Sequence, residues 1–409
     1  MKVLFILHGP PVPYHPPRAR AYYFIKFFSS FCDITLVSLY SNESEFKELL
    51  KLDPNVKLVM VRAPNLKNTL LKLFYSVGSR VTTTNLLYSR DWNFFGSIYY
   101  PTMQKRLLRL LEHEDFDVIC VPDIMSSYIH NLRYLMKIRG SKVLDSSFPH
   151  LYAYKQFYRH GFPRFILGYL SYRLFEVKRY RSFDAGIYVS RTHLELSKPF
   201  LPKQCYIISP GVDVDFFKPL YVEPRNLSIG FIGTMSYIPN ILSVFHFYHR
   251  IYSRIKNELP NVKFYVVGRN PVKKIKSLGR DPSVIITGAV EDIRNCYSMI
   301  DVVVNPIVVD DGGIKTKVLE AMAMGKAVVS TPLGARDIGA TDYENIVIAR
   351  NDREFAEKVV ELLKDEKERR RIGNNARKFV EENYSWRKQS KMLYNVFKEL
   401  VEGNFDELH

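Results

Sequence analysis

The sequence predicts an α/β protein with two Rossmann-like domains, and three observations support this prediction. The chain has 409 residues, of which 46% are hydrophobic and 25% are charged. This composition is typical of globular proteins, and the length exceeds that of one compact core. Short apolar strands alternate with helical stretches, which is the pattern of a parallel sheet covered by helices. The pattern stops at the irregular residues 209–226 and then begins again.

The strands are expected where apolar runs are short and bounded by polar or turn-forming residues. In the first half they are expected at residues 2–7, 33–39, 56–61, 117–121, 142–145, 184–189 and 205–208. In the second half they are expected at residues 227–233, 262–268, 283–288, 300–304, 326–330 and 346–348. A last helix is expected from Trp386 to about Val401. Residues 209–226, with Pro219 and Pro224, are predicted to be the hinge between the domains.

Composition excludes several classes of protein. The apolar content excludes a disordered or fibrous chain. No uncharged run of about 18 apolar residues occurs, and the amino terminus lacks the cleavage pattern of a secretory signal, so we expect a cytoplasmic protein. The four cysteines are far apart and lie in or beside apolar runs, which favours buried thiols over disulfides or a bound metal. They are Cys32, Cys120, Cys205 and Cys296.

The net charge of +17 is concentrated in the first half, where residues 1–200 contain 28 basic and 15 acidic side chains. Such a surplus suggests contact with an anionic partner, either nucleic acid, a phosphorylated small molecule or acidic lipid headgroups. Residues 152–181 contain ten aromatic and seven basic residues against the single acid Glu176. This segment is expected to pack its aromatic side chains internally, with or without contact to an anionic membrane surface. Stacking on nucleobases is less favoured, because no nucleic-acid-binding motif accompanies it.

Glycine follows four of the predicted strands in the second half. Ligands of open parallel sheets bind at the carboxyl ends of the strands, and glycine there lets a ligand approach the backbone. Glycine also ends strands for turn geometry alone. The four loops contain Gly233-Thr234, Gly268-Arg269, Gly288-Ala289-Val290 and Asp310-Asp311-Gly312-Gly313-Ile314-Lys315.

The last of these loops opens a helix that is expected to begin near Lys315 or Thr316. Its first turn carries Lys315 and Lys317, and cations are unfavourable at the positive end of a helix dipole unless an anion is bound there. Free main-chain N–H groups, two glycines and a lysine suit a phosphate. We therefore predict a phosphate site. The alternative is that both lysines point into solvent.

Glu320 lies within the apolar run 318–324 of the same helix. A buried carboxylate is costly unless a polar group satisfies it, and ribose hydroxyls would do so. The alternative is an exposed Glu320 paired with Lys317, one turn earlier.

These loops occur together with further motifs in an order and at a spacing that carry a resemblance. The matching residues are 233–240, 266–271, 288–293, 313–325 and 383–386. From Leu227 to Trp386 the sequence resembles the donor domain of the retaining GT-B glycosyltransferases of family 4 (glycosyl transferases group 1). It is most similar to their polysaccharide sugar-transferase branch.

The resemblance implies a GT-B fold, in which two Rossmann-like domains face a central cleft. It implies an acceptor-binding domain of residues 1–208 plus 388–409 and a nucleotide-sugar donor domain of residues 227–387. The implied reaction transfers a sugar from a UDP-, GDP- or ADP-linked donor to a glycan or lipid-linked acceptor, with retention of configuration and without a metal or cofactor. Peripheral contact with the inner membrane face stays open beside internal packing alone, and nucleic acid is not expected as a partner.

The resemblance also implies roles for individual residues. Glu320 would hold the nucleotide ribose, and the backbone of Val290 would contact the base. Basic charge would neutralise the phosphates as the leaving group departs. The remaining residues expected at the donor site are Gly233, Thr234, Gly312, Gly313, Ile314 and Thr316.

The sequence departs from the family pattern at several positions. The first glutamate of the paired-glutamate motif falls at Gly312, so that carboxylate is absent, and only Asp310 or Asp311 lies near enough to replace it in part. The arginine and lysine that many members carry after the first donor-domain strand are missing, which makes Lys315 and Arg269 the candidates for the phosphate charge. A downstream glutamate is replaced by Asp337.

In the first domain, Arg18 and Arg20 are expected to bind an anionic acceptor or the donor phosphates, or else to be ordinary surface arginines. His150 follows the fifth strand a few residues later than the family histidine. It is expected either to act in catalysis, together with Lys315 and Glu320, or to be a buried or surface side chain.

Three other functions remain open from the sequence. They are a catalytically inactive nucleotide-sugar-binding protein, suggested by the missing carboxylate at Gly312, a sugar-nucleotide epimerase of the same architecture, and a nucleic-acid binder, suggested by the charge.

Overall fold

A computed structural model describes most of the chain. The described residues are 1–62 except 8, 14, 15 and 41, then 114–122, 137–161, 180–220 and 227–403, with the single residues 111, 135, 166, 169 and 170. The chain divides into two compact units. Unit 1 comprises Met1–Pro210 with Trp386–His409, and unit 2 comprises Gly211–Ser385. Among the described helices, none is both long enough and apolar enough to cross a membrane.

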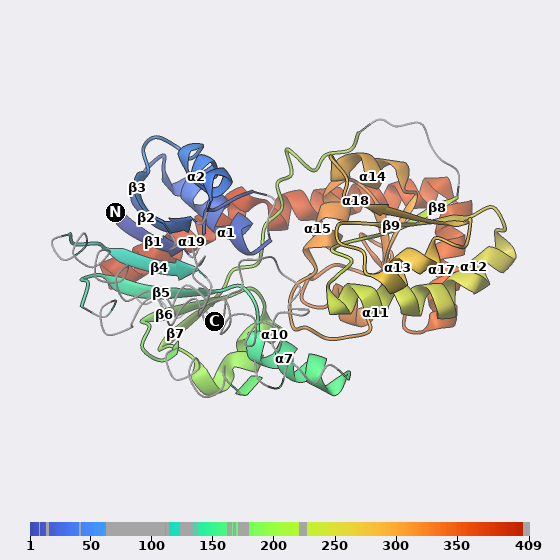
Figure 1. The fold of residues 1–409 in the computed structure, drawn as a ribbon, viewed down its shortest axis with the longest axis horizontal. Helices are drawn as coiled ribbons and strands as arrows, with labels where there is room; N and C mark the ends of the chain where they lie inside the picture. The colour runs from blue at the N-terminus through green and yellow to red at the C-terminus, as the bar shows by residue number, and fades with distance from the viewer. Residues whose placement is uncertain are drawn as a thin grey trace, which may run out of the picture. The chain divides into compact units, whose positions relative to one another are not determined.

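The described part of unit 1 contains a seven-stranded parallel sheet with the order β3-β2-β1-β4-β5-β6-β7 (Figure 1). Five of the six side chains of β1 are buried, and Val3 and Phe5 contribute to one core with Phe24 and Phe28. The strands are β1 (Lys2–Leu7), β2 (Asp33–Tyr40), β3 (Lys57–Arg62), β4 (Val118–Pro122), β5 (Ser141–Ser146), β6 (Ala185–Tyr188) and β7 (Gln204–Ile207).

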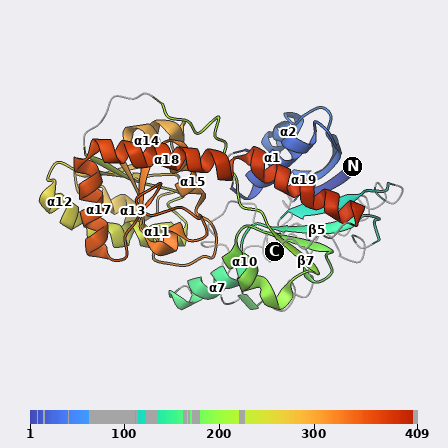
Figure 2. The same cartoon turned by 180° about the vertical axis from the view of Figure 1, so that it is seen from behind.

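The last helix of the chain, α19 (Trp386–Glu402), packs in unit 1 beside α1 (Pro16–Phe28), as Figure 2 shows. The Trp386 ring stacks on the Tyr23 ring with 4.8 Å between centroids, and the buried Phe397 ring lies 5.6 Å from Phe28. Unit 1 is therefore assembled from two distant parts of the sequence. Its other described helices are α2 (Glu43–Leu50), α7 (His150–Arg159), α10 (Arg191–Ser197) and the 3₁₀ turn η3 (Lys198–Phe200).

The described part of unit 2 contains a six-stranded parallel sheet with the order β10-β9-β8-β11-β12-β13. The strands are β8 (Ser228–Ile232), β9 (Lys263–Val267), β10 (Val284–Gly288), β11 (Val302–Asn305), β12 (Ala327–Ser330) and β13 (Val347–Ile348). The helices are α11 (Ile238–His246), the π-helical segment η4 (Phe247–Tyr252), α12 (Ser253–Glu258), α13 (Lys273–Leu278), α14 (Ile293–Met299), α15 (Thr316–Ala323), α16 (Pro332–Ala335), α17 (Asp352–Lys364) and α18 (Glu366–Tyr384).

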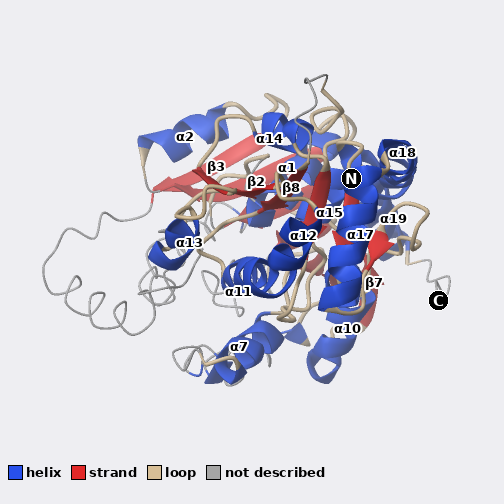
Figure 3. Ribbon diagram, turned by 90° about the vertical axis from the view of Figure 1, so that its right-hand side faces the viewer, coloured by secondary structure: helices blue, strands red, loops and turns tan. Residues whose placement is uncertain are grey.

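Alternate residues of the unit 2 strands face two separate cores, because successive side chains of a strand point to opposite faces. In β11, Val302 and Val304 pack in the core formed with α11, η4, α12 and α17, whereas Val303 packs in the core formed with α14, α15 and α18. Figure 3 shows α12 and α17 lying side by side. Both faces of the sheet are thus covered by helices, which explains the near-continuous apolar strands.

The predicted α/β class with two parallel sheets is confirmed, and each predicted strand has a counterpart that differs by a few residues at its ends. The predicted hinge differs more. Residues 211–220 belong to unit 2, where the Val212 N–H donates to the Tyr384 carbonyl (2.7 Å) and Phe217 is buried in the core. Residues 221–226 lie outside the described part of the chain.

Candidate functional site

The candidate site is built on the loop between β11 and α15. Gly312 has a φ of +76°, a left-handed conformation that favours glycine. Asx-type hydrogen bonds hold the loop: the Gly312 N–H donates to Asp310 Oδ1 (2.8 Å) and the Gly313 N–H to Asp311 Oδ1 (3.2 Å). The loop ends at Lys315, the residue before α15, where no side chain caps the helix. The expected start of this helix at Lys315 or Thr316 is confirmed, with Thr316 as its first residue.

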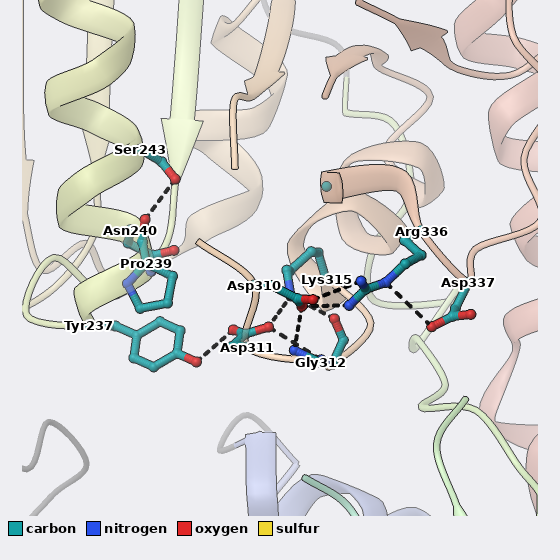
Figure 4. A network of polar contacts seen from close by, with 12 residues as sticks. Tyr237, Pro239, Asn240, Ser243, Asp310, Asp311, Gly312, Lys315, Arg336 and Asp337 are labelled. Carbon is teal, nitrogen blue, oxygen red and sulfur yellow. Dashed lines mark hydrogen bonds and ion pairs between the residues drawn. The ribbon is translucent and has the colours of Figure 1, made fainter. Parts of the chain in front are cut away.

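Lys315 is held inside this loop by two acceptors. Its ammonium donates to the Asp311 carboxylate and to the Gly313 carbonyl (2.6 Å), and the Tyr237 hydroxyl donates to Asp311 Oδ2 (2.6 Å), as Figure 4 shows. Lys315 is 9% exposed and Asp311 is 4% exposed. The alternative that Lys315 simply points into solvent is therefore wrong, and its charge is balanced by Asp311.

A second ion pair lies beside the first. The Arg336 guanidinium donates to both carboxylate oxygens of Asp310, including a 2.8 Å bond from Nη1 to Oδ2, and its Nε lies 4.0 Å from Asp337 (Figure 4). Arg336 was not among the predicted site residues. The ion pair with Asp310 brings the loop after β12 against the loop after β11.

Lys317, in the first turn of α15, points toward α11. Its ammonium donates to Asn240 Oδ1 (2.7 Å) and lies 4.0 Å from the centre of the Phe231 ring. Burial, together with the nearby Lys315 charge, lowers the pKa of Lys317 to about 7. The solvent-facing alternative is wrong for this lysine too, since the side chain is half-buried and satisfied by protein groups.

Glu320 pairs with a phenol. The Tyr297 hydroxyl donates to Glu320 Oε2 (3.0 Å), and it also lies 3.2 Å from the Lys317 carbonyl oxygen. Burial raises the pKa of Glu320 to about 7. The alternative of an exposed Glu320–Lys317 ion pair is wrong, because Glu320 is half-buried and Lys317 contacts Asn240.

The loops after β8 and β9 approach each other closely. A Cβ added at Gly268 would lie 1.8 Å from the Gly233 carbonyl oxygen, so only glycine fits there. The Thr234 carbonyl accepts from Asn240 Nδ2 (2.9 Å). Arg269 is exposed, and its carbonyl accepts from the Met235 N–H.

The other predicted donor-site residues lie at the same edge of the unit 2 sheet, in loops that follow the carboxyl ends of its strands. Val290 follows β10, and Ile314 precedes α15; both side chains are partly buried against the core that contains α14 and α15. The structure therefore places the predicted donor residues of unit 2 on four neighbouring strand-end loops and one helix start.

The predicted residues of unit 1 lie elsewhere in the fold. Arg20 is 3% exposed and donates through Nε to both oxygens of the buried Asp145 (2.8 and 2.7 Å) and through Nη1 to the Ser209 carbonyl (3.0 Å). It is not an ordinary surface arginine. Arg18 is half-buried, and its Nη1 lies 3.4 Å from Glu45 Oε1.

His150 is 4% exposed at the start of α7, and its ring lies 4.9 Å from the Phe148 ring. A second buried histidine, His193, was not predicted; its Nε2 lies 3.4 Å from Ser146 Oγ, and burial lowers its pKa to about 3. The basic aromatic segment 152–181 is described only at residues 152–161, 166, 169–170 and 180–181, so most of it lies outside the described residues.

Sequence reasoning missed the partners that hold the site residues, namely Tyr237, Asn240, Tyr297 and Arg336. Tyr237 and Asn240 stand inside the motif 233–240, and Arg336 precedes Asp337, so their positions beside recognised motifs were the available signal. Tyr297 lies in α14, 23 residues before Glu320, and no local pattern links the two.

Comparison with known proteins agrees with this geometry. The described fold aligns with the crystal structure of HepE from Anabaena in complex with UDP and glucose at a TM-score of 0.66 and 14% identity, over 97% of this chain and 99% of HepE. An uncharacterised 44.6 kDa protein of the cps region of Klebsiella pneumoniae is 25% identical over 228 residues, which are 53% of this chain and 56% of that protein. The capsular polysaccharide biosynthesis glycosyltransferase CapM of Staphylococcus aureus is 28% identical over 190 residues, or 44% and 48% of the two chains.

The predicted GT-B fold is confirmed by these likenesses. Residues 226–365 match the family model described as glycosyl transferases group 1. The matches span about half the length of the curated relatives.

Proposed function

We propose that this chain is a glycosyltransferase that transfers a sugar from a nucleotide-diphosphate sugar to a glycan or lipid-linked acceptor, with retention of configuration. The observation that carries the proposal is the family match over residues 226–365, which contain the strand-end loops and the helix start described above. HepE, which shares the fold, binds UDP and glucose, and CapM acts in capsular polysaccharide biosynthesis. A UDP-, GDP- or ADP-linked donor fits this proposal.

In this proposal the start of α15 receives the donor diphosphate. The first turn of a helix offers main-chain N–H groups without intrahelical acceptors, and its dipole favours an anion. The backbone of Gly312, Gly313 and Ile314 faces the sugar and diphosphate. Lys315 stabilises the negative charge that grows on the leaving nucleotide, which is the main electrostatic demand of the reaction.

Glu320 is proposed to hold the nucleotide ribose. Because Tyr297 donates to Oε2, the other carboxylate oxygen is left for a ribose hydroxyl. Gly233, Thr234, Thr316, Arg269 and the backbone of Val290 complete the proposed donor site. No metal or cofactor takes part in the proposed reaction.

Unit 1 is proposed to bind the acceptor, with Arg18, Arg20 and His150 on that side, while residues 227–387 bind the donor. Because Arg20 forms a buried ion pair with Asp145, it also stabilises the fold of unit 1. The proposal includes a cytoplasmic location with peripheral contact to the inner membrane face, which the basic surplus of the first half supports.

A second candidate is a protein that binds a nucleotide-sugar without transferring the sugar. Gly312 occupies the position of the first motif glutamate, and its left-handed φ disfavours a side chain there. The carboxylates next to it are engaged, Asp310 with Arg336 and Asp311 with Lys315. This candidate predicts nucleotide binding with no turnover on any acceptor.

The test is a thermal-shift panel of UDP, GDP, ADP and their common sugar conjugates, because a ligand of the folded state raises its melting temperature. The phosphate role of Lys315 is tested with Lys315→Met combined with Asp311→Asn, which removes both charges together. Removing Lys315 alone would leave a buried uncompensated carboxylate. We expect the double variant to fold and to bind the stabilising nucleotide about 10- to 100-fold more weakly. This loss of affinity corresponds to the free energy of one hydrogen bond to a charged group.

Unchanged affinity in the double variant would refute the Lys315 assignment. Release of free sugar or transfer to a glycan from the stabilising conjugate separates the two candidate functions. Conversion of the donor without any acceptor would instead favour an epimerase.

A further inference from the structure

Two lysines lie at the start of α15, Lys315 just before the helix and Lys317 in its first turn, but only Lys315 is neutralised by a described carboxylate. Lys315 forms an ion pair with Asp311. Among the residues that the structure describes, Lys317 has no carboxylate within ion-pair distance; its ammonium is held by the Asn240 amide and the face of Phe231. The unbalanced positive charge of this helix start therefore belongs to Lys317.

Two helix starts meet at the Lys317 ammonium. Asn240 stands in the first turn of α11 and Lys317 in the first turn of α15, and the 2.7 Å hydrogen bond joins them. Neither helix has a side-chain cap or an acidic residue in its first turn. The positive ends of two helix dipoles thus converge on a cation, an arrangement that an anion would stabilise.

The neighbouring backbone fixes this arrangement. Asn240 Nδ2 donates to the Thr234 carbonyl, so its Oδ1 is the atom turned to Lys317. A Cβ at Gly233 would lie 2.6 Å from Asn240 Nδ2, so the loop after β8 lies directly against this amide. Residues 233–240 contain no lysine or arginine of their own.

We infer that Lys317, reaching across from α15 to the start of α11, is the cation that binds the diphosphate of the donor next to the loop after β8. This inference rests on the proposed function and deepens it, because it assigns the phosphate charge to a residue that the sequence analysis did not choose. Lys315, already paired with Asp311, then shapes the loop and acts beside Lys317 on the diphosphate.

The proton balance of binding follows from the charges around Lys317. Three charged side chains lie around the Lys317 ammonium, namely Lys315, Asp311 and Glu320. The Tyr297 hydroxyl lies at the main-chain carbonyl of Lys317. The groups that α11 and β8 contribute are the Asn240 amide and the Phe231 ring. With a pKa of about 7, Lys317 is only partly protonated near neutral pH. A bound diphosphate raises this pKa, so binding takes up a proton. Ionisation of Glu320 would have the opposite effect on the proton count, so the measurement is made in a Glu320→Gln background.

The experiment is isothermal titration calorimetry of the full chain with UDP-glucose, GDP-mannose and ADP-glucose, in buffers of different ionisation enthalpy. Their diphosphates do not change charge near neutral pH, so a proton taken up belongs to the protein. In the Glu320→Gln background we expect net proton uptake, which Lys317→Met abolishes while weakening binding at least about 10-fold. The matching nucleoside should bind both forms equally, since it carries no phosphate.

Lys326→Met is the matched control. Lys326 is another lysine of unit 2 whose pKa burial lowers, to about 8, and it donates to the Ser298 carbonyl. Its replacement should leave both the affinity and the proton uptake unchanged. Lys317→Arg, which keeps the charge, should retain most of the affinity and separates a charge effect from a folding effect.

If Lys317→Met leaves the affinity unchanged, this inference is wrong, and the proposed donor site is not affected. Equal loss of diphosphate and nucleoside affinity would also overturn it, because Lys317 would then act on the fold of the site. Failure of all three conjugates to bind the wild-type chain would overturn the proposed donor site itself.

Discussion

At the scale of single residues, the site holds two ionisable groups whose pKa values burial moves toward neutrality from opposite directions. Glu320 rises to about 7 and Lys317 falls to about 7. Each lies in the part of α15 that packs against the sheet, where the charged form is penalised. Without a ligand both charges cost stability, and in the proposed function the ribose and the diphosphate of the donor would each satisfy one of them.

The effect of Glu320 on stability has a definite sign. Its pKa is raised in the folded state, so its protonated form adds stability below the unfolded pKa of about 4.5, and this contribution is lost as the pH rises to about 7. We expect Glu320→Gln to remove that slope and to be more stable than wild type at pH 7, by on the order of 1–3 kcal/mol. Urea unfolding at a series of pH values between these limits measures it. A wild-type curve parallel to that of the variant would contradict the burial of this carboxyl.

The place of a residue in the fold could be predicted where a local pattern carries it, whereas the roles assigned to the site residues stay predictions. Residues 312–320 contain a glycine pair, two lysines and a glutamate around one helix start, and the structure has that helix begin at Thr316. These hydrogen-bond partners could not be predicted, because Asp311–Tyr237 and Lys317–Asn240 join residues more than 70 positions apart. Lys315 has its carboxylate partner four residues away at Asp311, whereas the contact of Lys317 with Asn240 leaves no local signal.

At the scale of elements, close contact between strand-end loops holds the site together. Gly268 and Gly288 both have positive φ, 146° and 69°. The two glycines differ in the space around them. A Cβ added at Gly268 would lie 1.8 Å from the Gly233 carbonyl oxygen, whereas a Cβ added at Gly288 would have no atom within 4 Å.

This pair gives a matched test of the loop contact. Gly288→Ala should cost about 1 kcal/mol, the strain of a left-handed residue alone. Gly268→Ala should cost more than about 2 kcal/mol, because the loops after β8 and β9 must separate. Chemical unfolding of both variants provides the comparison. Equal costs would mean that the loops move apart easily and that their approach does not shape the site.

The order of the elements was predictable because buried parallel strands form short apolar runs that glycine or proline bounds. The exact ends of strands were not, since β11 begins at Val302 where the apolar run begins at Ile300. Ile300 instead fills space against Gly230, where a Cβ would lie 2.1 Å from Ile300 Cδ1. Such packing between neighbouring elements leaves no signal in a local pattern.

At the scale of the whole molecule, unit 1 is completed by a helix from the end of the chain. The Trp386 ring stacks on Tyr23 and lies edge-on to Phe24, with 5.9 Å between those centroids. The Val212–Ser385 bridge anchors the preceding residue in unit 2. The step from Ser385 to Trp386 is therefore one of the two places where the backbone passes between the units, the other being the step from Pro210 to Gly211.

We expect Trp386→Ala to destabilise unit 1 selectively, by about 2–4 kcal/mol, because it removes a large aromatic contact from that core only. Trp386→Phe, which keeps a ring against Tyr23, should recover most of the loss. Hydrogen exchange resolves the two units: amides of α1, α19 and β1 should lose protection, and amides of β8, β9 and β11 should keep theirs. The nucleotide binding proposed for unit 2 should persist in the variant. Equal loss of protection in both units would show that they unfold as one, so that the returning helix stabilises unit 2 as strongly as unit 1.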